Sequence, residues 1–297
     1  MNAGKPRKSA VCLFISLLMM MFSVPLCYSE EAPTKGGQAE LLWYGQSAFR
    51  LITLSGKVIV IDPWILKNPK TPANLKDLDR MGKVDLVIVT HGHWDHIADA
   101  PEIARKNNVP LWGPGDLNQT LTLLGVLPAQ QLPRFNKGGT INPFPGVKIT
   151  AVHAEHSSIY VAVNPATGEE QAYPGGEPIG FIIELENGFK IYHAGDTGLF
   201  GDMALIEQLY KPDLALLPIG GHFTMGPQDA ALAVNQYLKP TYVIPMHYQT
   251  NPFNIGSPED FVKYLGKSKT KALVLKPGET VRFDAKKKLV GIQPAEK

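Results

Sequence analysis

Short apolar runs separated by turn residues recur along the chain from about residue 40 onward. The first three lie close together at 40–45, 48–54 and 57–62, with Gly-Gln-Ser and Ser-Gly between them. Apolar runs of this length, bounded by such turn residues, predict β-strands. The beginning of this region is therefore predicted to be a β-meander.

Further along the chain, predicted strands alternate with helical segments. The strands are expected at 84–90, 147–152, 179–185, 189–194, 213–219, 242–246, 272–276 and 280–284, and the helices at 97–107, 202–210, 227–238 and 258–265. Strands followed by helices in two successive halves predict two packed sheets with helices outside them. The Gly- and Pro-rich stretch 164–178 is interpreted either as an active-site rim or as a hairpin excursion.

The first 29 residues have a different pattern. Lys5, Arg7 and Lys8 precede 21 uncharged residues at 9–29. This pattern is typical of a secretory signal peptide, because the apolar part is shorter than the roughly 20 residues that a membrane-spanning helix requires. We therefore expect an exported, periplasmic protein that contacts a membrane only if this leader remains uncleaved as an anchor. The expected organisation is a signal peptide at 1–29, a linker at 30–39 and a single domain at 40–297.

Composition and charge narrow the picture. Of the 297 residues, 44% are apolar and 19% are charged, which is typical of a globular protein. The net charge changes from +2 to −1 when the three positive charges of the leader are removed, so a nucleic-acid partner is not expected and a small-molecule substrate is. Both cysteines, Cys12 and Cys27, lie in the leader. The remaining chain therefore has no thiol for a disulfide, a nucleophile or a metal ligand.

The strongest chemical signal is a cluster of histidines directly after the predicted strand at 84–90. None of the eight histidines precedes His91, and the run Thr90-His91-Gly92-His93-Trp94-Asp95-His96 contains four potential metal ligands. At a strand end, residues two apart point the same way, so His91 and His93 are able to bind one cation. Asp95 and His96 lie on the next turn, where they can reach a second cation.

Three further potential ligands each follow an apolar run: His156, Asp196 and His247. Placing polar groups at successive strand ends is costly unless they meet a charged centre. We therefore expect these three side chains to converge on the histidine cluster.

The order of these motifs resembles the metallo-β-lactamase superfamily. The segments 43–49 and 192–197 resemble more narrowly its branch of metal-dependent hydrolases related to L-ascorbate-6-phosphate lactonase. The resemblance implies an α+β fold, a four-layer αββα sandwich, with two divalent metal ions at one edge of the sheets. It places the ligands as follows: His91, His93 and His156 on one metal, Asp95, His96 and His247 on the other, and Asp196 bridging both. Nitrogen and oxygen ligands fit Zn²⁺ and also admit Mn²⁺ or Fe.

Several other residues have two interpretations. Asp62 either orients a ligand histidine or is a turn residue before a proline. His153 is the alternative to His156 as a ligand, and His193 is either a supporting or a core histidine. His222 either contacts substrate and donates a proton to a leaving group, or lies in a surface loop.

The expected function is that of an exported hydrolase in which a metal-bound hydroxide attacks an ester, lactone or phosphodiester bond. Asp95 and His222 are the candidate catalytic residues. A phosphodiester would favour cations at the rim, for which Lys67, Lys70 and Lys76 are candidates. The alternatives are a metal-binding protein of the same fold without turnover, and a β-lactamase.

Overall fold

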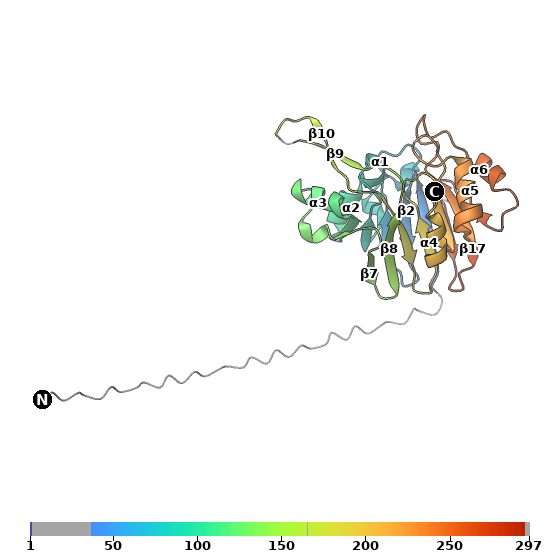
Figure 1. The fold of residues 1–297 in the computed structure, drawn as a ribbon, viewed down its shortest axis with the longest axis horizontal. Helices are drawn as coiled ribbons and strands as arrows, with labels where there is room; N and C mark the ends of the chain where they lie inside the picture. The colour runs from blue at the N-terminus through green and yellow to red at the C-terminus, as the bar shows by residue number, and fades with distance from the viewer. Residues whose placement is uncertain (2–36, 165, 295–297) are drawn as a thin grey trace. The chain divides into compact units, whose positions relative to one another are not determined.

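Two β-sheets packed face to face form the centre of the molecule, as the computed structural model shows (Figure 1). The structure describes Met1 and residues 37–164 and 166–294, and residues 37–164 and 166–294 belong to one compact unit. The predicted signal peptide, apart from Met1, and most of the predicted linker lie outside the described residues.

The first sheet has eight strands, most of them from the first half of the chain. In spatial order they are β17 (Leu289–Gln293), β16 (Thr280–Phe283), β1 (Ala39–Gly45), β2 (Ala48–Ile52), β3 (Val58–Ile61), β4 (Leu86–Ile88), β5 (Leu111–Pro114) and β6 (Arg134–Phe135). The strands from β16 to β3 pair antiparallel, and β3 to β6 pair parallel.

The second sheet has seven strands. In spatial order they are β15 (Lys271–Ala272), β14 (Tyr242–Met246), β13 (Leu214–Pro218), β12 (Lys190–His193), β11 (Ile179–Glu184), β8 (Val147–His153) and β7 (Thr140–Phe144). A separate two-stranded ribbon, β9 (Ile159–Val163) with β10 (Glu170–Pro174), projects from the body of the molecule (Figure 1).

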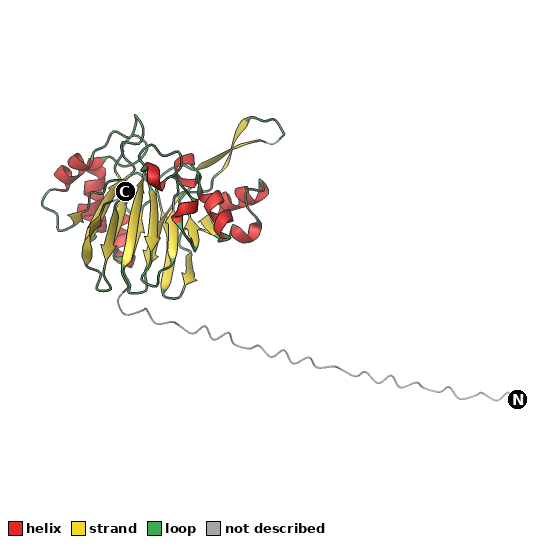
Figure 2. Cartoon of the chain, turned by 180° about the vertical axis from the view of Figure 1, so that it is seen from behind, coloured by secondary structure: helices red, strands yellow, loops and turns green. Residues whose placement is uncertain are grey.

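Successive side chains along each strand point to opposite faces of its sheet, so the apolar residues form an inner core between the sheets and two outer layers. Leu41 and Phe49 of the first sheet and Phe181 of the second belong to one buried cluster between the sheets. The opposite faces pack against helices, which flank the strands on both sides in Figure 2. The predicted four-layer αββα sandwich is therefore confirmed.

The helices cover the outer faces of the two sheets. The first sheet is covered by α1 (Trp94–Ile97), α2 (Ala100–Asn107) and α3 (Gly115–Leu123). The second is covered by α4 (Met203–Tyr210), α5 (Pro227–Leu232), which continues as a π-helix to Leu238, and α6 (Pro258–Leu265). Short 3₁₀ turns lie at Ala73–Leu75, Asp79–Met81 and Ala129–Gln131.

Helix α6 shows how the sequence sets these elements. Ser257 is the N-cap residue, and its hydroxyl oxygen accepts a hydrogen bond from the Asp260 backbone N–H at 3.1 Å. Pro258 occupies the first helical position. Phe261 and Leu265, four residues apart, share one face and are buried against the second sheet.

The structure corrects several sequence expectations. The helix expected at 97–107 is α2, which begins only at Ala100 and follows a separate short helix, α1, that ends at Ile97; the strand expected at 272–276 is reduced to Lys271–Ala272. The stretch 164–178 contains β10, which confirms the hairpin interpretation. Within the described part of the chain, no helix is both long and apolar enough to cross a membrane.

Candidate metal centre

Seven strand ends meet at one edge of the sandwich, and six of them, all but that of β13, carry the potential ligands and their neighbours. The parallel pairing of β3 with β4 and of β12, β13 and β14 brings their carboxyl ends to the same edge. Strand β1 runs the same way as β3, and β8 the same way as β12, because each pair is related through one antiparallel strand between them. The chain continues from these ends into the predicted ligands, with Asp95 and His96 on α1.

His91, His93 and His156 form the first ligand group. The Nε2 atom of His91 lies 3.0 Å from Nδ1 of His93, and Nε2 of His156 lies 3.3 Å from the same Nδ1 atom. A tetrahedral Zn²⁺ with bonds of about 2.05 Å separates two ligand nitrogens by about 3.4 Å. The three nitrogen atoms are therefore arranged closely enough to bind one ion, and together they form a potential metal-binding group.

Asp95, His96, Asp196 and His247 form the second group. The Oδ2 atom of Asp196 lies 3.2 Å from Nε2 of His96 and 3.0 Å from Nε2 of His247. The same oxygen lies 3.6 Å from Nε2 of His156 in the first group. Asp196 thus lies between the two groups, which is the position that the bridging role predicts.

The donor set and its unsatisfied atoms fit divalent cations. Asp196 is 3% exposed, and its Oδ1 atom has no hydrogen-bond partner among the described residues. A buried carboxylate oxygen without a partner is costly, and a cation removes that cost. The seven side chains offer five imidazoles and two carboxylates, a set that suits Zn²⁺, Mn²⁺ or Fe.

Asp62 supports a histidine in each group. Its buried carboxylate accepts hydrogen bonds from the Thr90 backbone N–H at 2.7 Å, from the Thr90 hydroxyl at 2.7 Å and from Nδ1 of His96 at 2.8 Å. Because the Thr90 hydroxyl donates to Asp62, its oxygen is free to accept from Nδ1 of His91, 3.0 Å away. With the proton of each imidazole held on Nδ1, the Nε2 atoms of His91 and His96 carry no proton and are free to bind a metal ion.

Gln46, which the sequence reasoning missed, also contacts the second group. Its Nε2–H donates to Oδ2 of Asp95 at 2.7 Å and lies 2.7 Å from Nε2 of His247, while its Oε1 accepts from the Thr250 hydroxyl. Gln46 is 1% exposed and follows the carboxyl end of β1. Gln46 directly follows β1, which runs parallel to β3, so its side chain is at the same edge of the sheet as Asp62. This position at a strand end is the signal that could have identified it from the sequence.

The backbone is held in an uncommon conformation at three of these strand ends. Gln46, Asp62 and His247 have φ angles of 52°, 45° and 56°. Left-handed backbone costs a residue other than glycine on the order of 1–3 kcal/mol and tends to occur at functional sites. Gly92 is needed for another reason, since a Cβ there would lie 2.8 Å from the Ile159 carbonyl oxygen.

Burial and mutual repulsion keep the first group neutral. Burial lowers the pKa of His91 well below its usual value, and the nearby His96 lowers it further. Burial, followed by the neighbouring His156, also lowers the pKa of His93, and burial lowers that of His156. Neutral imidazoles are the form that binds a metal ion.

The second group behaves as an interacting set of opposite charges. Although burial opposes it, Asp196 raises the pKa of His247 to about 9, and Asp196 and Asp95 raise that of His96 well above its usual value. The pKa of Asp196 lies well below its usual value because His247 and His96 outweigh its burial. At neutral pH the metal-free group therefore holds protons that a metal ion must displace.

The three remaining histidines have different environments. His153 lies 3.2 Å from Glu155 and is outside both ligand groups, which leaves His156 as the histidine brought to the cluster. His193 is fully buried, with Nε2 3.0 Å from the Ser47 carbonyl oxygen and Nδ1 accepting from the Gly195 N–H, so it is a core histidine satisfied by backbone. His222 is exposed and stacks on the Phe253 ring.

A cavity of about 570 Å³ opens onto both ligand groups. Among the described residues that line it are Asp95, Phe223 and Ser157, but His222, Lys67, Lys70 and Lys76 are not lining residues. Ser158 holds the loop behind it, because its oxygen accepts from the Gly92 N–H and its hydroxyl donates to the Gly175 carbonyl.

Comparison with known proteins identifies the class of this site. Residues 57–248 match the family model described as the beta-lactamase superfamily domain. The chain therefore belongs to the metallo-β-lactamase superfamily, as its motifs indicated.

Close relatives narrow this to one family of metal-dependent hydrolases. A UPF0173 metal-dependent hydrolase of Polaromonas sp. is 59% identical over 269 residues, covering 91% of this chain and 98% of the relative. A relative from Rubrobacter xylanophilus is 42% identical and covers 82% of this chain and 96% of the relative. The chain is a metal-dependent hydrolase of this family.

Solved structures agree with this assignment. A novel metallo hydrolase from the archaeon Ignicoccus hospitalis is 39% identical, with a TM-score of 0.71, and the match covers 83% of this chain and 98% of that one. An isothiocyanate hydrolase from Delia radicum gut bacteria shares the fold at 19% identity and a TM-score of 0.59, with 83% of this chain and 99% of that one covered.

Proposed function

We propose that this hydrolase binds two divalent metal ions and uses them to cleave an ester, lactone or phosphodiester bond. His91, His93 and His156 would hold one ion, Asp95, His96 and His247 the other, and Asp196 both. The observation that carries the proposal is the position of Oδ2 of Asp196, within 3.6 Å of a histidine of the first group and within 3.2 Å of two histidines of the second.

When bound, such ions act as Lewis acids and lower the pKa of a water molecule from about 15.7 toward about 7. The chain's own residues prepare this chemistry. Asp196 keeps a negative charge between the two groups, which offsets the repulsion between two cations. Asp95 faces the cavity with its side chain 13% exposed, and His96 helps to hold its pKa below the usual value, so an ionised carboxylate is available there to accept a proton.

Metal content and turnover test this proposal together. Elemental analysis of purified protein loaded with Zn²⁺, Mn²⁺ or Fe²⁺ is expected to give two ions per chain, and His93→Ala to give fewer. His153→Ala is the matched control, because His153 lies outside both ligand groups. Fewer than one ion per wild-type chain after loading would overturn the dinuclear site.

A substrate panel of esters, lactones, phosphodiesters and β-lactams tests the reaction itself. We expect turnover of at least one class by the loaded wild-type protein and by His153→Ala, with a loss of at least about 100-fold in His93→Ala. Equal activity of His93→Ala would show that this site is not the catalytic one.

We further propose that residues 1–29 direct export and are removed before Glu30. The basic start and the uncharged stretch that follows support this. The test is fractionation of a Gram-negative host followed by mass measurement of the N-terminus, with deletion of residues 2–29 as the control. A periplasmic chain beginning at Glu30 is expected. An intact N-terminus in the membrane fraction would support the anchor instead, and one in the cytoplasm would contradict export.

A further inference from the structure

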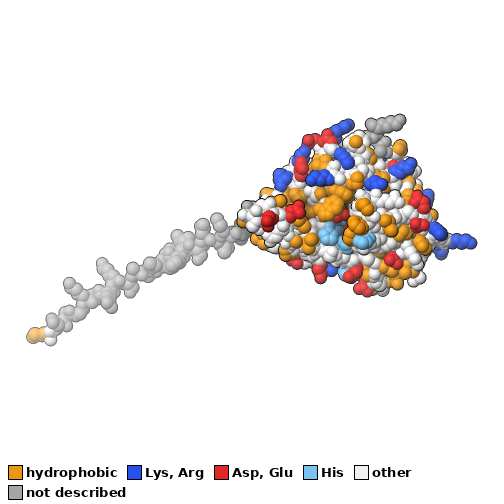
Figure 3. All heavy atoms as spheres, turned by 90° about the horizontal axis from the view of Figure 1, so that it is seen from above, with side chains coloured by type: hydrophobic (Ala, Val, Ile, Leu, Met, Phe, Trp, Pro, Cys, Tyr) orange, Lys and Arg blue, Asp and Glu red, His pale blue; other side chains and the backbone are white. Residues whose placement is uncertain are grey.

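The cavity above the ligand groups has a polar floor and apolar walls. The floor consists of the ligands His93, Asp95, His156, Asp196 and His247, and the walls include Trp94, Ile159, Phe223, Pro252 and Phe253. Figure 3 shows histidine side chains on this face of the molecule with hydrophobic side chains beside them. A substrate that reaches the floor must therefore pack against these walls.

The aromatic walls are exposed and yet held in place. Trp94 is 60% exposed, but its ring meets the buried Trp64 ring edge-on at 4.8 Å. Phe223 and Phe253 are 50% and 56% exposed, with their rings 5.9 Å apart. Exposed apolar side chains gathered around a concave polar site are typical of ligand-binding surfaces.

His222 fixes the second wall from outside the cavity. Its ring stacks on Phe253 at 5.1 Å and meets Phe223 edge-on at 4.4 Å. The three rings support one another, and Phe223 and Phe253 both line the cavity while His222 packs against them from outside it. On this geometry His222 is a positioning residue.

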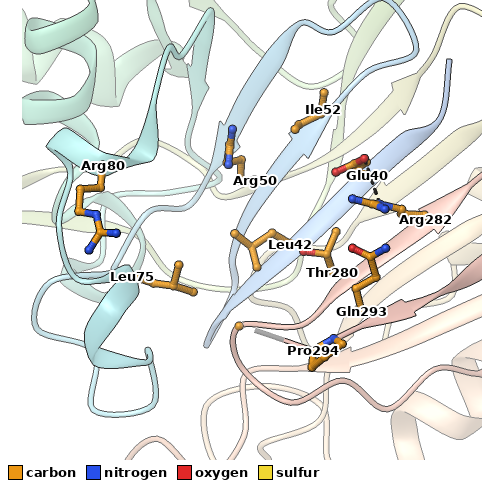
Figure 4. A pocket seen from close by; sticks show the side chains of 11 residues that line it. Glu40, Leu42, Arg50, Ile52, Leu75, Arg80, Thr280, Arg282, Gln293 and Pro294 are labelled. Atoms are coloured by element: carbon orange, nitrogen blue, oxygen red, sulfur yellow. Dashed lines mark ion pairs between the residues drawn. The ribbon is translucent and has the colours of Figure 1, made fainter. Parts of the chain in front are cut away.

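Positive charge is missing from the walls. Among the described residues lining the cavity, none is a lysine or an arginine. Three arginines, Arg50, Arg80 and Arg282, line instead a separate cavity on the outer face of the first sheet, where Arg282 forms an ion pair with Glu40 (Figure 4). Sites that bind phosphoryl groups usually supply arginine or lysine to the oxygens that the metal ions do not hold.

We propose that the substrate is an uncharged ester or lactone with an alkyl or aryl group that packs against Trp94, Phe223 and Phe253. This inference rests on the proposed hydrolytic function and excludes phosphodiesters from it. One water is consumed: its oxygen bonds to the acyl carbon, the acyl C–O bond breaks, one proton goes to the leaving alkoxide and the other to solvent.

The test measures how kcat/KM depends on the length of the acyl chain of neutral esters and compares these esters with an anionic phosphodiester. Zinc-loaded protein is assayed with 4-nitrophenyl acetate, butyrate and hexanoate and with bis(4-nitrophenyl) phosphate. Burial of one methylene changes kcat/KM by about fourfold, so we expect a rise of about 15-fold from acetate to butyrate. The phosphodiester should be at least about 100-fold slower than hexanoate. A phosphodiester within tenfold of the best ester, or no dependence on chain length, would overturn the inference.

Two variants of the cavity walls and one surface control test whether the dependence on chain length arises at these walls. Phe253→Ala and Trp94→Ala should flatten the dependence of kcat/KM on chain length relative to wild type. Leu209→Ala is the control, because Leu209 is 68% exposed on α4 and does not line the cavity. Unchanged chain-length dependence in both wall variants would also contradict the inference.

A binding measurement separates this inference from the proposed function. The neutral fluorescent probe N-phenyl-1-naphthylamine should bind saturably to the loaded protein and more weakly to Phe253→Ala. If no ester is cleaved but this binding pattern is found, the apolar recognition stands and the hydrolysis of these esters fails. If neither probe binding nor chain-length dependence is found, the inference is wrong whatever else the protein hydrolyses.

Discussion

Replacing Asp62 by asparagine is expected to weaken both metal positions, the second much more than the first. The buried carboxylate accepts from two donors of Thr90 and from Nδ1 of His96, at 2.7–2.8 Å. Asparagine offers one oxygen in place of two. If its NH₂ group takes the place of Oδ1, the Thr90 N–H loses its acceptor, and if it takes the place of Oδ2, both the Thr90 hydroxyl and Nδ1 of His96 lose theirs. In the second arrangement the His96 proton moves to Nε2, the atom that faces Asp196 at 3.2 Å.

The structure sets the size of the effect. Partners that orient metal ligands are worth about 10- to 100-fold in metal affinity, or about 1.4–2.7 kcal/mol. Asp62 is 0% exposed, so no bulk water replaces the lost acceptor, and we expect the upper end, about 100-fold, for the second ion. His91 is reached only through the Thr90 hydroxyl, and the first ion should lose about tenfold or less.

Zinc titration against a chromophoric competitor measures the two affinities in one experiment. Thr90→Val is the matched variant, because it removes the link to His91 and leaves the contact between Asp62 and His96. It should weaken the first ion by about tenfold and leave the second within about threefold. Asp85→Asn is the control for a general effect of losing a carboxylate beside a strand, since Asp85 accepts a hydrogen bond from the Val58 N–H far from the ligands. A folded Asp62→Asn protein that binds its second ion within about threefold of wild type would refute this reasoning.

Three further predictions concern the same centre. Gln46→Leu removes the donor to Asp95 and should weaken the second ion by about tenfold in the same titration. Because the pKa of His247 is raised to about 9 and that of His96 well above its usual value, both protons must leave on metal binding, so affinity for the second ion should rise by more than about tenfold per pH unit from about pH 6.5 to about pH 8.5; a flat profile would contradict this. His222→Phe keeps an aromatic ring against Phe253 and should preserve kcat/KM for hexanoate within about threefold with an unchanged pH profile, whereas loss of the basic limb would show that His222 transfers a proton.

The sequence predicted the long apolar strands and the ligands that follow them, because both signals are local. Strands β4 and β14 are uninterrupted, mostly buried apolar runs, and a ligand follows each within three residues: His91 after β4 and His247 after β14. The helix at 97–107 was predicted as one element because its charge pattern does not show the break at Ala98 and Asp99.

Elements that depend on distant partners were missed. Strand β10 has exposed, mixed side chains and is held by its pairing with β9, so it has no clear apolar pattern. Strand β9 is a short apolar run, but Ile159, Val161 and Val163 are exposed on it, because it pairs only with β10 and packs in neither sheet. Helix α3 lies on the outer face of the first sheet, but its polar sequence includes Asn118, whose amide donates to the Leu111 carbonyl at 2.8 Å. Such a contact between a side chain and a strand seven residues away is not visible in a periodic pattern.

The difference between local and long-range signals also explains the predictions for two residues: Asp62 had two interpretations, and Gln46 was not identified as part of the site. Each lies at a strand end with left-handed backbone, a conformation that sequence patterns assign to glycine, asparagine or aspartate and rarely to glutamine. That backbone costs free energy at each position, and the contacts with His96, Asp95 and His247 supply a reason for keeping it. The arrangement of the ligands and the conformation of these strand ends therefore depend on each other, and only the assembled sheets bring together the two halves of the chain that make the site.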